Sequence, residues 1–145
     1  MSAAYFDSSV LISILLREGR AEVSAAIWDA QEVRVSSVLL GAECWTGVRR
    51  HFLRTGKEIK PGWREERIAF LDRVLGMVEL KPVDVEIMEF VKKNPRLADC
   101  RTLDALHLAT ALFFREHADS DLLFVTLDPQ LRETALKFQF KVLPE

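Results

Sequence analysis

Four acidic residues have positions in the sequence that suggest chemistry. Asp7 and Asp128 directly follow short apolar runs, and Glu43 and Asp104 lie among apolar residues in segments with helical periodicity. If the chain brings the four together, their charges conflict. Two ionised carboxylates about 5 Å apart repel each other by about 3 kcal/mol at an effective dielectric constant of about 20. A converging set of four would therefore need a cation.

The identity of that cation follows from the ligand type. Oxygen donors alone favour Mg²⁺ or Mn²⁺, and the sequence has no cluster of cysteines or histidines that would indicate zinc. Such an ion binds phosphate oxygens and lowers the pKa of bound water for in-line attack. The chemistry expected of the converging acids is phosphodiester hydrolysis.

Each acid also has a purely structural interpretation. Asp7 can cap the helix that follows it, and Asp128, with Pro129 behind it, suits the cap of the next helix. Asp104 lies in a first helical turn, where the helix dipole stabilises a negative charge. For Asp7 the competing interpretation is a carboxylate at the C-terminal edge of a sheet, where open α/β folds place their sites. Thr126 lies two residues before Asp128, so in a strand both side chains would point to the same side.

Glu43 lies on the inward face of its predicted helix, together with Leu40 and Cys44. A buried carboxylate without a partner costs several kcal/mol. We therefore expect Glu43 to have either an arginine or lysine partner, or a metal-binding or catalytic role. His107 lies on the same side of its helix as Asp104, and we expect it to pack or to form hydrogen bonds rather than to bind metal.

The elements that must position these residues follow from hydrophobic periodicity. Short apolar runs predict strands at residues 3–6, 33–36, 78–80, 122–127 and 141–143. Helical spacing predicts helices at residues 10–16, 21–30, 68–75, 84–93, 101–114 and 131–138, and another that begins at Val38. Strands alternate with helices, and the connections are too long for hairpins. This predicts an α/β fold with a mainly parallel central sheet and helices on both faces.

The bulk composition bounds the class of protein. A length of 145 residues suits one domain over residues 1–145, and 49% hydrophobic with 29% charged residues excludes a disordered chain. The net charge of -2 excludes a general polyanion binder, so a nucleic-acid site would be a local patch. We find two cysteines without a disulfide framework, no signal peptide and no apolar run near the about 20 residues that span a bilayer. A cytoplasmic protein without a membrane anchor is expected.

One segment is strongly basic. Its cations are Arg49, Arg50, Arg54, Lys57, Lys60, Arg64 and Arg67, with Phe52 and Trp63 among them. The segment can be a solvated helical arm, with a loop between two helices. Alternatively, it can be an edge that contacts phosphates and offers an aromatic side chain for stacking. Under the second interpretation, Arg49, Arg50 and Arg54 are the candidates for contacts with nucleic acid.

Four sequence blocks together resemble the PIN domain, and within it the VapC-type toxins of bacterial toxin–antitoxin pairs. The blocks are residues 7–12 (DSSVLI), 41–43 (GAE), 101–111 (RTLDALHLATA) and 126–128 (TLD). They span almost the whole chain in order, and the block around Asp104 is the most specific. The resemblance implies a Mg²⁺- or Mn²⁺-dependent endoribonuclease.

The same resemblance implies roles for individual residues. Asp7 and Asp104 would be the principal metal ligands, and Glu43 and Asp128 would complete the acidic catalytic site directly or through water. The hydroxyls that hold carboxylates or water would be those of Ser9 and Thr126. Family members are commonly homodimers that cleave RNA and are held inactive by an antitoxin whose tail covers the site.

Three other functions compete with this interpretation. A phosphoacceptor module of the receiver type also uses an acidic sheet edge, but it needs two acids together after the first strand, and Asp7 is single. A PIN-like protein that binds RNA or a partner without cutting would not need all four acids. A DNA-directed nuclease of the same fold would use the same metal chemistry, and the contacts to the 2′-hydroxyl that distinguish RNA are not visible in a sequence.

Overall fold

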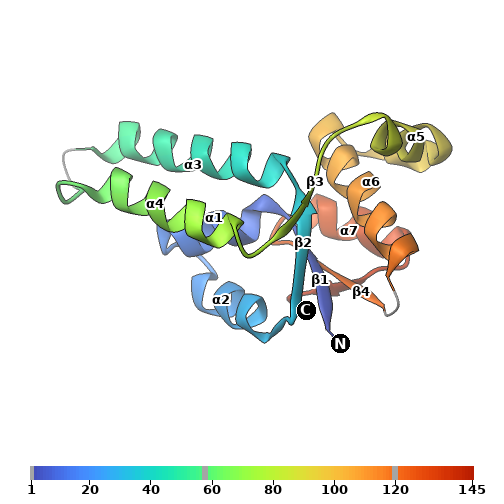
Figure 1. Ribbon diagram of the computed structural model, residues 1–145, viewed down its shortest axis with the longest axis horizontal. Helices are drawn as coiled ribbons and strands as arrows, with labels where there is room; N and C mark the ends of the chain where they lie inside the picture. Colours follow the sequence, from blue (N-terminus) through green and yellow to red (C-terminus); the bar gives the residue numbers. More distant parts are fainter. Residues whose placement is uncertain (1, 57–58, 119–120) are drawn as a thin grey trace.

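The computed structural model describes residues 2–56, 59–118 and 121–145, and in these residues five strands form one sheet. The strands are β1 (Ala3–Phe6), β2 (Val33–Ser37), β3 (Glu79–Lys81), β4 (Leu122–Val125) and β5 (Lys141–Leu143). Their order is β3-β2-β1-β4-β5, and every neighbouring pair is parallel. The predicted parallel sheet is confirmed, with β1 at its centre (Figure 1).

The central strand β1 is an apolar run whose last three residues are fully buried, as expected for a parallel strand covered on both faces. Its register with β4 places Phe6 opposite Val125. Both strands therefore end at the same edge, and Asp7 and Thr126 are the first residues beyond it. The Asp7 N–H still donates to the Val125 carbonyl (3.0 Å), so the backbone that carries Asp7 is fixed to the sheet.

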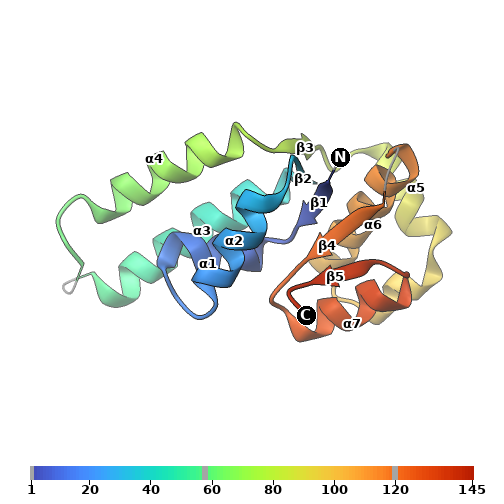
Figure 2. The ribbon, with the colours of Figure 1, turned by 90° about the horizontal axis from the view of Figure 1, so that it is seen from below.

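Helices cover both faces of the sheet, as predicted (Figure 2). They are α1 (Ser8–Leu16), α2 (Ala21–Ala30), α3 (Leu39–Thr55), α4 (Trp63–Leu75), α5 (Val85–Lys93), α6 (Thr102–His117) and α7 (Pro129–Lys137), with a 3-10 helix, η1 (Pro95–Asp99). Alternation along β1 separates two cores, because Tyr5 packs with Leu108 of α6 whereas Phe6 packs with Leu11 of α1 and Leu40 of α3. Among the helices of the described residues, none is both long and apolar enough to cross a bilayer.

Helices α3 and α4 lie side by side and extend beyond the sheet, and they carry the basic segment (Figure 1, Figure 2). Of its predicted cations, Lys57 lies outside the described residues. The Arg64 guanidinium lies 4.5 Å from the centre of the Phe52 ring, and the rings of His51 and Trp63 are 5.4 Å apart. Both aromatic side chains pack within the pair of helices. These contacts favour the helical-arm interpretation over a surface for base stacking.

The chain leaves β4 earlier than the sequence predicted. The strand expected over residues 122–127 ends at Val125, and the Asp128 N–H donates to Thr126 Oγ1 (3.1 Å) in the turn that follows. The prediction that Thr126 and Asp128 share one side of a strand is therefore wrong. Helix α7 begins at Pro129, before the periodic segment over residues 131–138 but where the cap interpretation of Asp128 places its start. The sequence did not predict η1.

The placement of α6 in the core predicts a large mutational effect. Leu108 on α6 is fully buried, whereas Leu53 on α3 is 80% exposed. We expect Leu108→Ala to lower the free energy of unfolding by about 2–5 kcal/mol, because the deletion loses buried contacts and leaves a cavity. The matched variant Leu53→Ala should change it by less than about 0.5 kcal/mol. Urea denaturation followed by circular dichroism measures both, and equal effects would contradict the packing described here.

Candidate active site

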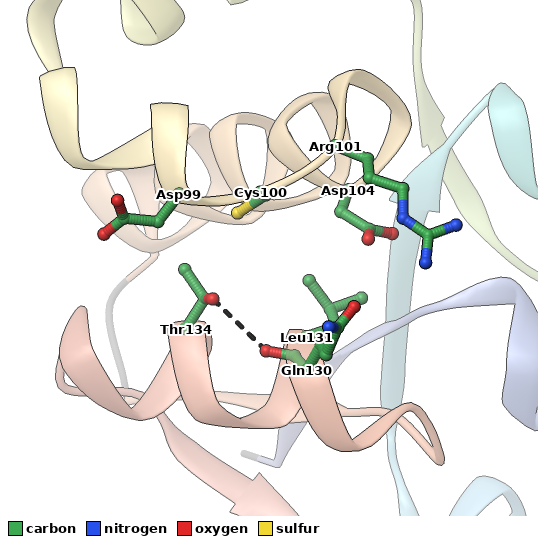
Figure 3. A pocket seen from close by; sticks show the side chains of 7 residues that line it. All are labelled: Asp99, Cys100, Arg101, Asp104, Gln130, Leu131 and Thr134. Carbon is green, nitrogen blue, oxygen red and sulfur yellow. Dashed lines mark hydrogen bonds between the residues drawn. The ribbon is translucent and has the colours of Figure 1, made fainter.

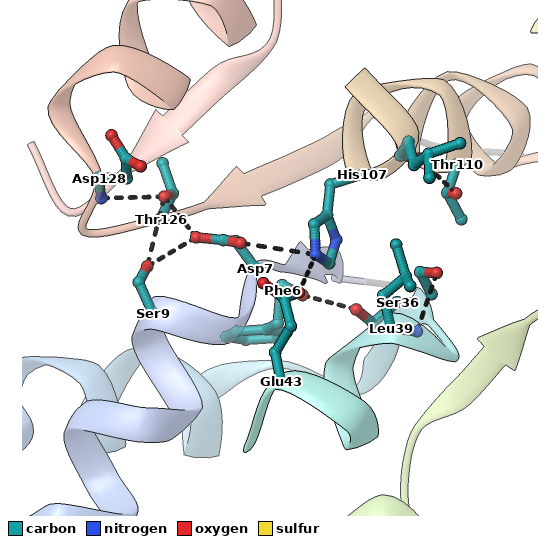
Figure 4. Close-up of polar contacts among 12 residues, drawn as sticks. Phe6, Asp7, Ser9, Ser36, Leu39, Glu43, His107, Thr110, Thr126 and Asp128 are labelled. Atoms are coloured by element: carbon teal, nitrogen blue, oxygen red, sulfur yellow. Dashed lines mark hydrogen bonds and ion pairs between the residues drawn. The ribbon is translucent and has the colours of Figure 1, made fainter. Parts of the chain in front are cut away.

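The four predicted acids lie at the ends of strands or near the starts of helices. Asp7 follows β1, Asp128 follows β4, Glu43 lies near the start of α3, and Asp104 lies in the first turn of α6. Figure 4 shows the first three around the ends of β1 and β4, and Figure 3 shows Asp104 at the start of α6.

Asp7 is buried, with an exposed fraction of 5%. Its Oδ2 accepts hydrogen bonds from Ser9 Oγ (2.7 Å) and Thr126 Oγ1 (2.9 Å), and its Oδ1 lies 3.8 Å from His107 Nε2 (Figure 4). Although Asp7 occupies the N-cap position of α1, its side chain makes no capping hydrogen bond. The helix-cap interpretation of Asp7 is therefore wrong, and its carboxylate belongs to the edge of the sheet.

Ser9 and Thr126 are themselves fixed by the backbone that follows β4. The Leu127 N–H donates to Ser9 Oγ (2.9 Å), and the Asp128 N–H donates to Thr126 Oγ1 (3.1 Å). Because each hydroxyl oxygen accepts a backbone hydrogen, its own hydrogen is directed to Asp7. The two hydroxyls thus hold the orientation of the Asp7 carboxylate.

Glu43 has a histidine as its partner. His107 is almost fully buried, with its Nε2 2.6 Å from Glu43 Oε1 and its Nδ1 2.6 Å from the Tyr5 hydroxyl. Nε2–H donates to Glu43 in either protonation state, because the Tyr5 hydroxyl can donate to or accept from Nδ1. Of the two alternatives for Glu43, the arginine or lysine partner is not found among the described residues, and the metal-binding or catalytic role stays a prediction. The expectation that His107 forms hydrogen bonds is confirmed.

The environment of His107 favours its charged form. Burial alone lowers the pKa of His107, but the hydrogen bond with Glu43 and the negative charges of Asp7, Glu43 and Asp104 outweigh it, so the pKa is raised above its ordinary value. Burial also raises the pKa of Tyr5 well above its ordinary value, so the Tyr5 hydroxyl keeps its proton. A protonated His107 reduces the net negative charge among the acids.

Asp104 is half-buried, and its carboxyl pKa is raised. Burial is the largest cause, followed by the negative charges of Asp128 and Asp7, with a smaller contribution from Glu43, while His107 acts in the opposite direction. Such couplings require that the acids lie near one another. The structure thus brings the four predicted acids into one electrostatic environment.

Asp128 combines two roles. Its Oδ1 accepts hydrogen bonds from the N–H groups of Gln130 (2.9 Å) and Leu131 (3.3 Å), which caps α7. The cap interpretation of Asp128 is confirmed. Its charge also raises the pKa of Asp104, so capping does not remove it from the acidic group.

Comparison with known proteins gives the family. The sequence matches the PIN domain family over residues 4–137. The chain belongs to the PIN domain family. It is also 32% identical over 111 residues to Ribonuclease VapC46 of Mycobacterium tuberculosis, covering 77% of this chain and 75% of that protein. A toxin-antitoxin complex from Klebsiella pneumoniae shares the fold, with a TM-score of 0.61, 20% identity and 87% of each chain covered.

The acids of this PIN domain offer only carboxylate oxygens, the ligands that Mg²⁺ and Mn²⁺ prefer. Within residues 2–56, 59–118 and 121–145, no three aspartate, glutamate, histidine or cysteine side chains are arranged to hold one ion. Burial raises the pKa of Asp104 most, and the repulsion from Asp128 and Asp7 that adds to it is the kind that a divalent cation relieves. The donor set therefore fits such an ion by ligand type and charge, and other acids would have to turn toward the fixed Asp7 carboxylate for three of them to hold one ion.

The three candidate arginines of the PIN domain differ in position. Arg50 lines a groove of about 350 Å³ together with Glu43 and Leu103. Arg49 and Arg54 are exposed on α3, and neither lines this groove. Arg50 is thus the arginine of this set that the structure brings beside a predicted acid.

Sequence reasoning missed Tyr5, which holds the ring of His107. Period-2 alternation in β1 directs Tyr5 to the face that α6 covers, opposite to Ala4 and Phe6. That alternation, together with the expected burial of the helix around Asp104, was the available signal.

A pocket beside Asp104 was also missed. It has a volume of about 340 Å³ and lies between the start of α6 and helix α7 (Figure 3). Its walls come from residues 99–104 and 130–134, which are distant in the sequence. No local pattern could therefore reveal it.

The raised pKa of Asp104 predicts a stabilising substitution. Ionised Asp104 lowers the free energy of unfolding at neutral pH. This loss of stability disappears as the pH falls from the raised pKa of Asp104 in the folded protein toward its pKa in the unfolded chain. In metal-free buffer, Asp104→Asn should raise the free energy of unfolding at pH 7, because it removes this unfavourable charge. The gain should be at most about 1 kcal/mol, since solvent screens the half-buried group. This gain should shrink as the pH is lowered.

Urea denaturation at several pH values measures this effect. The exposed Asp29 on α2 supplies the matched control, and Asp29→Asn should leave the stability nearly unchanged. A loss of stability in Asp104→Asn at neutral pH would mean that Asp104 is favourably paired in the folded protein.

Proposed function

We propose that this PIN domain protein is a VapC-type toxin, an endoribonuclease that hydrolyses RNA phosphodiester bonds with Mg²⁺ or Mn²⁺. The observation that carries the proposal is the buried Asp7 carboxylate at the end of β1, close enough to Asp104 for its charge to raise the pKa of that residue. The kinship with Ribonuclease VapC46 supports RNA as the substrate.

In this proposal Asp7 and Asp104 are the principal metal ligands, and Glu43 and Asp128 complete the site directly or through water. These residues would hold a divalent ion, which would supply positive charge to a phosphate oxygen and lower the pKa of a bound water molecule for in-line attack. Ser9 and Thr126 hold Asp7 Oδ2 in place, so the orientation of this carboxylate is set before any ligand arrives.

His107 acts in the proposed site as a positioning residue. Its Nε2–H holds Glu43, and its ring is held in turn by Tyr5. Because the neighbouring acids favour its protonated form, His107 also limits the repulsion between Glu43 and Asp7. These two effects keep Glu43 at the site.

The proposed biology follows from the kinship with a VapC ribonuclease. We propose that a cognate antitoxin inhibits the protein, that its tail covers the acidic site, and that the protein acts as a homodimer in the cytoplasm. An acidic site of this kind attracts a basic segment of a partner, because complementary charges favour encounter and fix orientation.

Asp7→Asn tests the nuclease directly. We expect cleavage of a mixed RNA sample in Mn²⁺ buffer to fall by at least about 100-fold, since changes to residues that merely support a metal ligand already cost about 10–100-fold. Gel analysis of RNA, beside a single-stranded DNA of similar length, measures the effect. Asp29→Asn, with the same chemical change at an exposed position, should cleave like the wild type.

Three outcomes would overturn parts of the proposal. Normal cleavage by Asp7→Asn would remove Asp7 from the site. Cleavage of DNA but not RNA would identify a DNA-directed nuclease, and RNA binding without cleavage of either would identify a binding module. Calorimetric titration of Mn²⁺ adds a readout without substrate, in which saturable binding by the wild type should be lost in Asp7→Asn.

Arg49 and Arg50 test whether α3 contacts RNA. If both neutralise phosphates, their joint replacement by alanine should reduce the slope of log affinity against log salt by about 1.4, because each contact to a single strand contributes about 0.7. Fluorescence anisotropy with a labelled RNA at several salt concentrations measures the slope. The matched control replaces Arg20 and Lys93, two exposed cations outside α3, by alanine. An unchanged slope would mean that Arg49 and Arg50 do not contact phosphates and that the basic segment is a solvated helical arm.

A further inference from the structure

The pocket beside Asp104 has the size of a site for one small organic group. Its volume of about 340 Å³ lies at the lower end of the range of about 300–1,000 Å³ found for ligand pockets. Figure 3 shows it between the start of α6, which carries Asp104, and helix α7 below. A group that fills this pocket would therefore adjoin a residue of the proposed catalytic site.

The polar groups of the pocket are distributed unevenly from one end to the other. Asp104 and Arg101 lie at one end, and Asp99 lies at the other (Figure 3). Cys100 and Thr134 line the space between them, and burial raises the pKa of the Cys100 thiol, which therefore stays uncharged. The pocket thus has a cation at its catalytic end and an acid at its far end.

The charges exclude a phosphate from most of this pocket. Its two carboxylates, Asp99 and Asp104, outnumber its one guanidinium, that of Arg101. Across the part of the chain that the structure describes, the Arg101 side chain donates no hydrogen bond and forms no ion pair. It is therefore available to a phosphate, but only at the end beside Asp104.

The hydrogen-bonding groups at the far end and in the middle are mainly acceptors. An ionised Asp99 only accepts. Thr134 Oγ1 donates its hydrogen to the Gln130 carbonyl (3.2 Å), and its oxygen also forms a hydrogen bond with Cys100. One lone pair of the Thr134 oxygen then remains for a ligand. A group that satisfies this part of the pocket must be rich in hydrogen-bond donors.

We propose that the pocket binds the nucleobase next to the cleaved phosphate and prefers a base with an exocyclic amino group. This inference rests on the proposed function, which places a phosphate at Asp104. The base lies toward Asp99, and Arg101 contacts the phosphate that joins the base to the cleavage site. Guanine fits best, because its N1–H and its amino group are adjacent and can both donate to one carboxylate. Uracil, which has no amino group, fits least.

The test observes binding without catalysis. Nucleoside 5′- and 3′-monophosphates of all four bases are titrated into the ¹⁵N-labelled full chain in metal-free buffer, and amide chemical shifts are recorded. We expect saturable shifts at Cys100, Leu131 and Thr134, with the guanine nucleotide bound about tenfold more tightly than the uracil nucleotide. Asp99→Asn replaces an acceptor oxygen by a donor amide and should remove this preference. Asp29→Asn should keep it, and the spectra themselves report whether each variant is folded.

Several results would overturn the inference. They are shifts confined to other amides, equal binding of guanine and uracil nucleotides by the wild type, and an unchanged preference in Asp99→Asn. N-acetyl-arginine amide, titrated in parallel, represents a basic side chain of a protein partner. If it alone shifts these amides, the pocket belongs to the partner and not to RNA.

The nuclease and the pocket can fail separately. A wild-type protein that cleaves RNA, but whose pocket amides do not respond to nucleotides, retains the proposed function and loses this inference. A protein that binds guanine nucleotides in the pocket but cleaves no RNA loses the proposed function and retains the pocket as a nucleotide site.

Discussion

Repulsion between carboxylates at one edge of the sheet is the constraint on which the rest of the site depends. Burial and the charges of Asp128 and Asp7 together raise the pKa of Asp104, so the acids are already in conflict in the folded protein. The fold accommodates this conflict by giving three of them separate support. Asp7 has two hydroxyls, Glu43 has an imidazole, and Asp128 has two N–H groups of α7. Because no arginine or lysine among the described residues forms an ion pair with these acids, their charge remains available to a cation.

That support depends on tertiary structure. Thr126 reaches Asp7 across 119 positions of sequence, and His107 reaches Glu43 across 64. Both contacts rely on the parallel register of β1 with β4 and on the packing of α6 against the sheet. Since a slip of one residue in a strand turns every side chain to the opposite face, the register that builds the core also orients the Asp7 carboxylate. Stability and site geometry therefore depend on the same pairing.

The sequence could predict those features of the fold and the site that depend on local residue patterns. Apolar runs and helical spacing predicted the strands, the order of elements and the burial of α6, and the blocks around Asp7 and Asp104 predicted the PIN domain, which is confirmed. The role of Asp7 could not be decided, because a helix cap and a sheet-edge acid need the same residue at the same turn. Its contact with Thr126 separates the two. The partner of Glu43 could not be named, because a buried carboxylate is satisfied by whichever donor the fold brings, and here that donor is His107.

The surroundings of Glu43 differ from those of Asp104. On the side of Glu43, His107 and Tyr5 form a closed, buried set of hydrogen bonds. On the side of Asp104 the surface opens into the pocket toward α7, while Arg50 borders the groove that Glu43 and Leu103 also line. In the proposed nuclease, a single strand that runs from α7 toward α3 passes the acids between a base-sized pocket and a cation. The two sides of the acidic site thus offer a strand different contacts, a pocket beside Asp104 and an arginine beside Glu43.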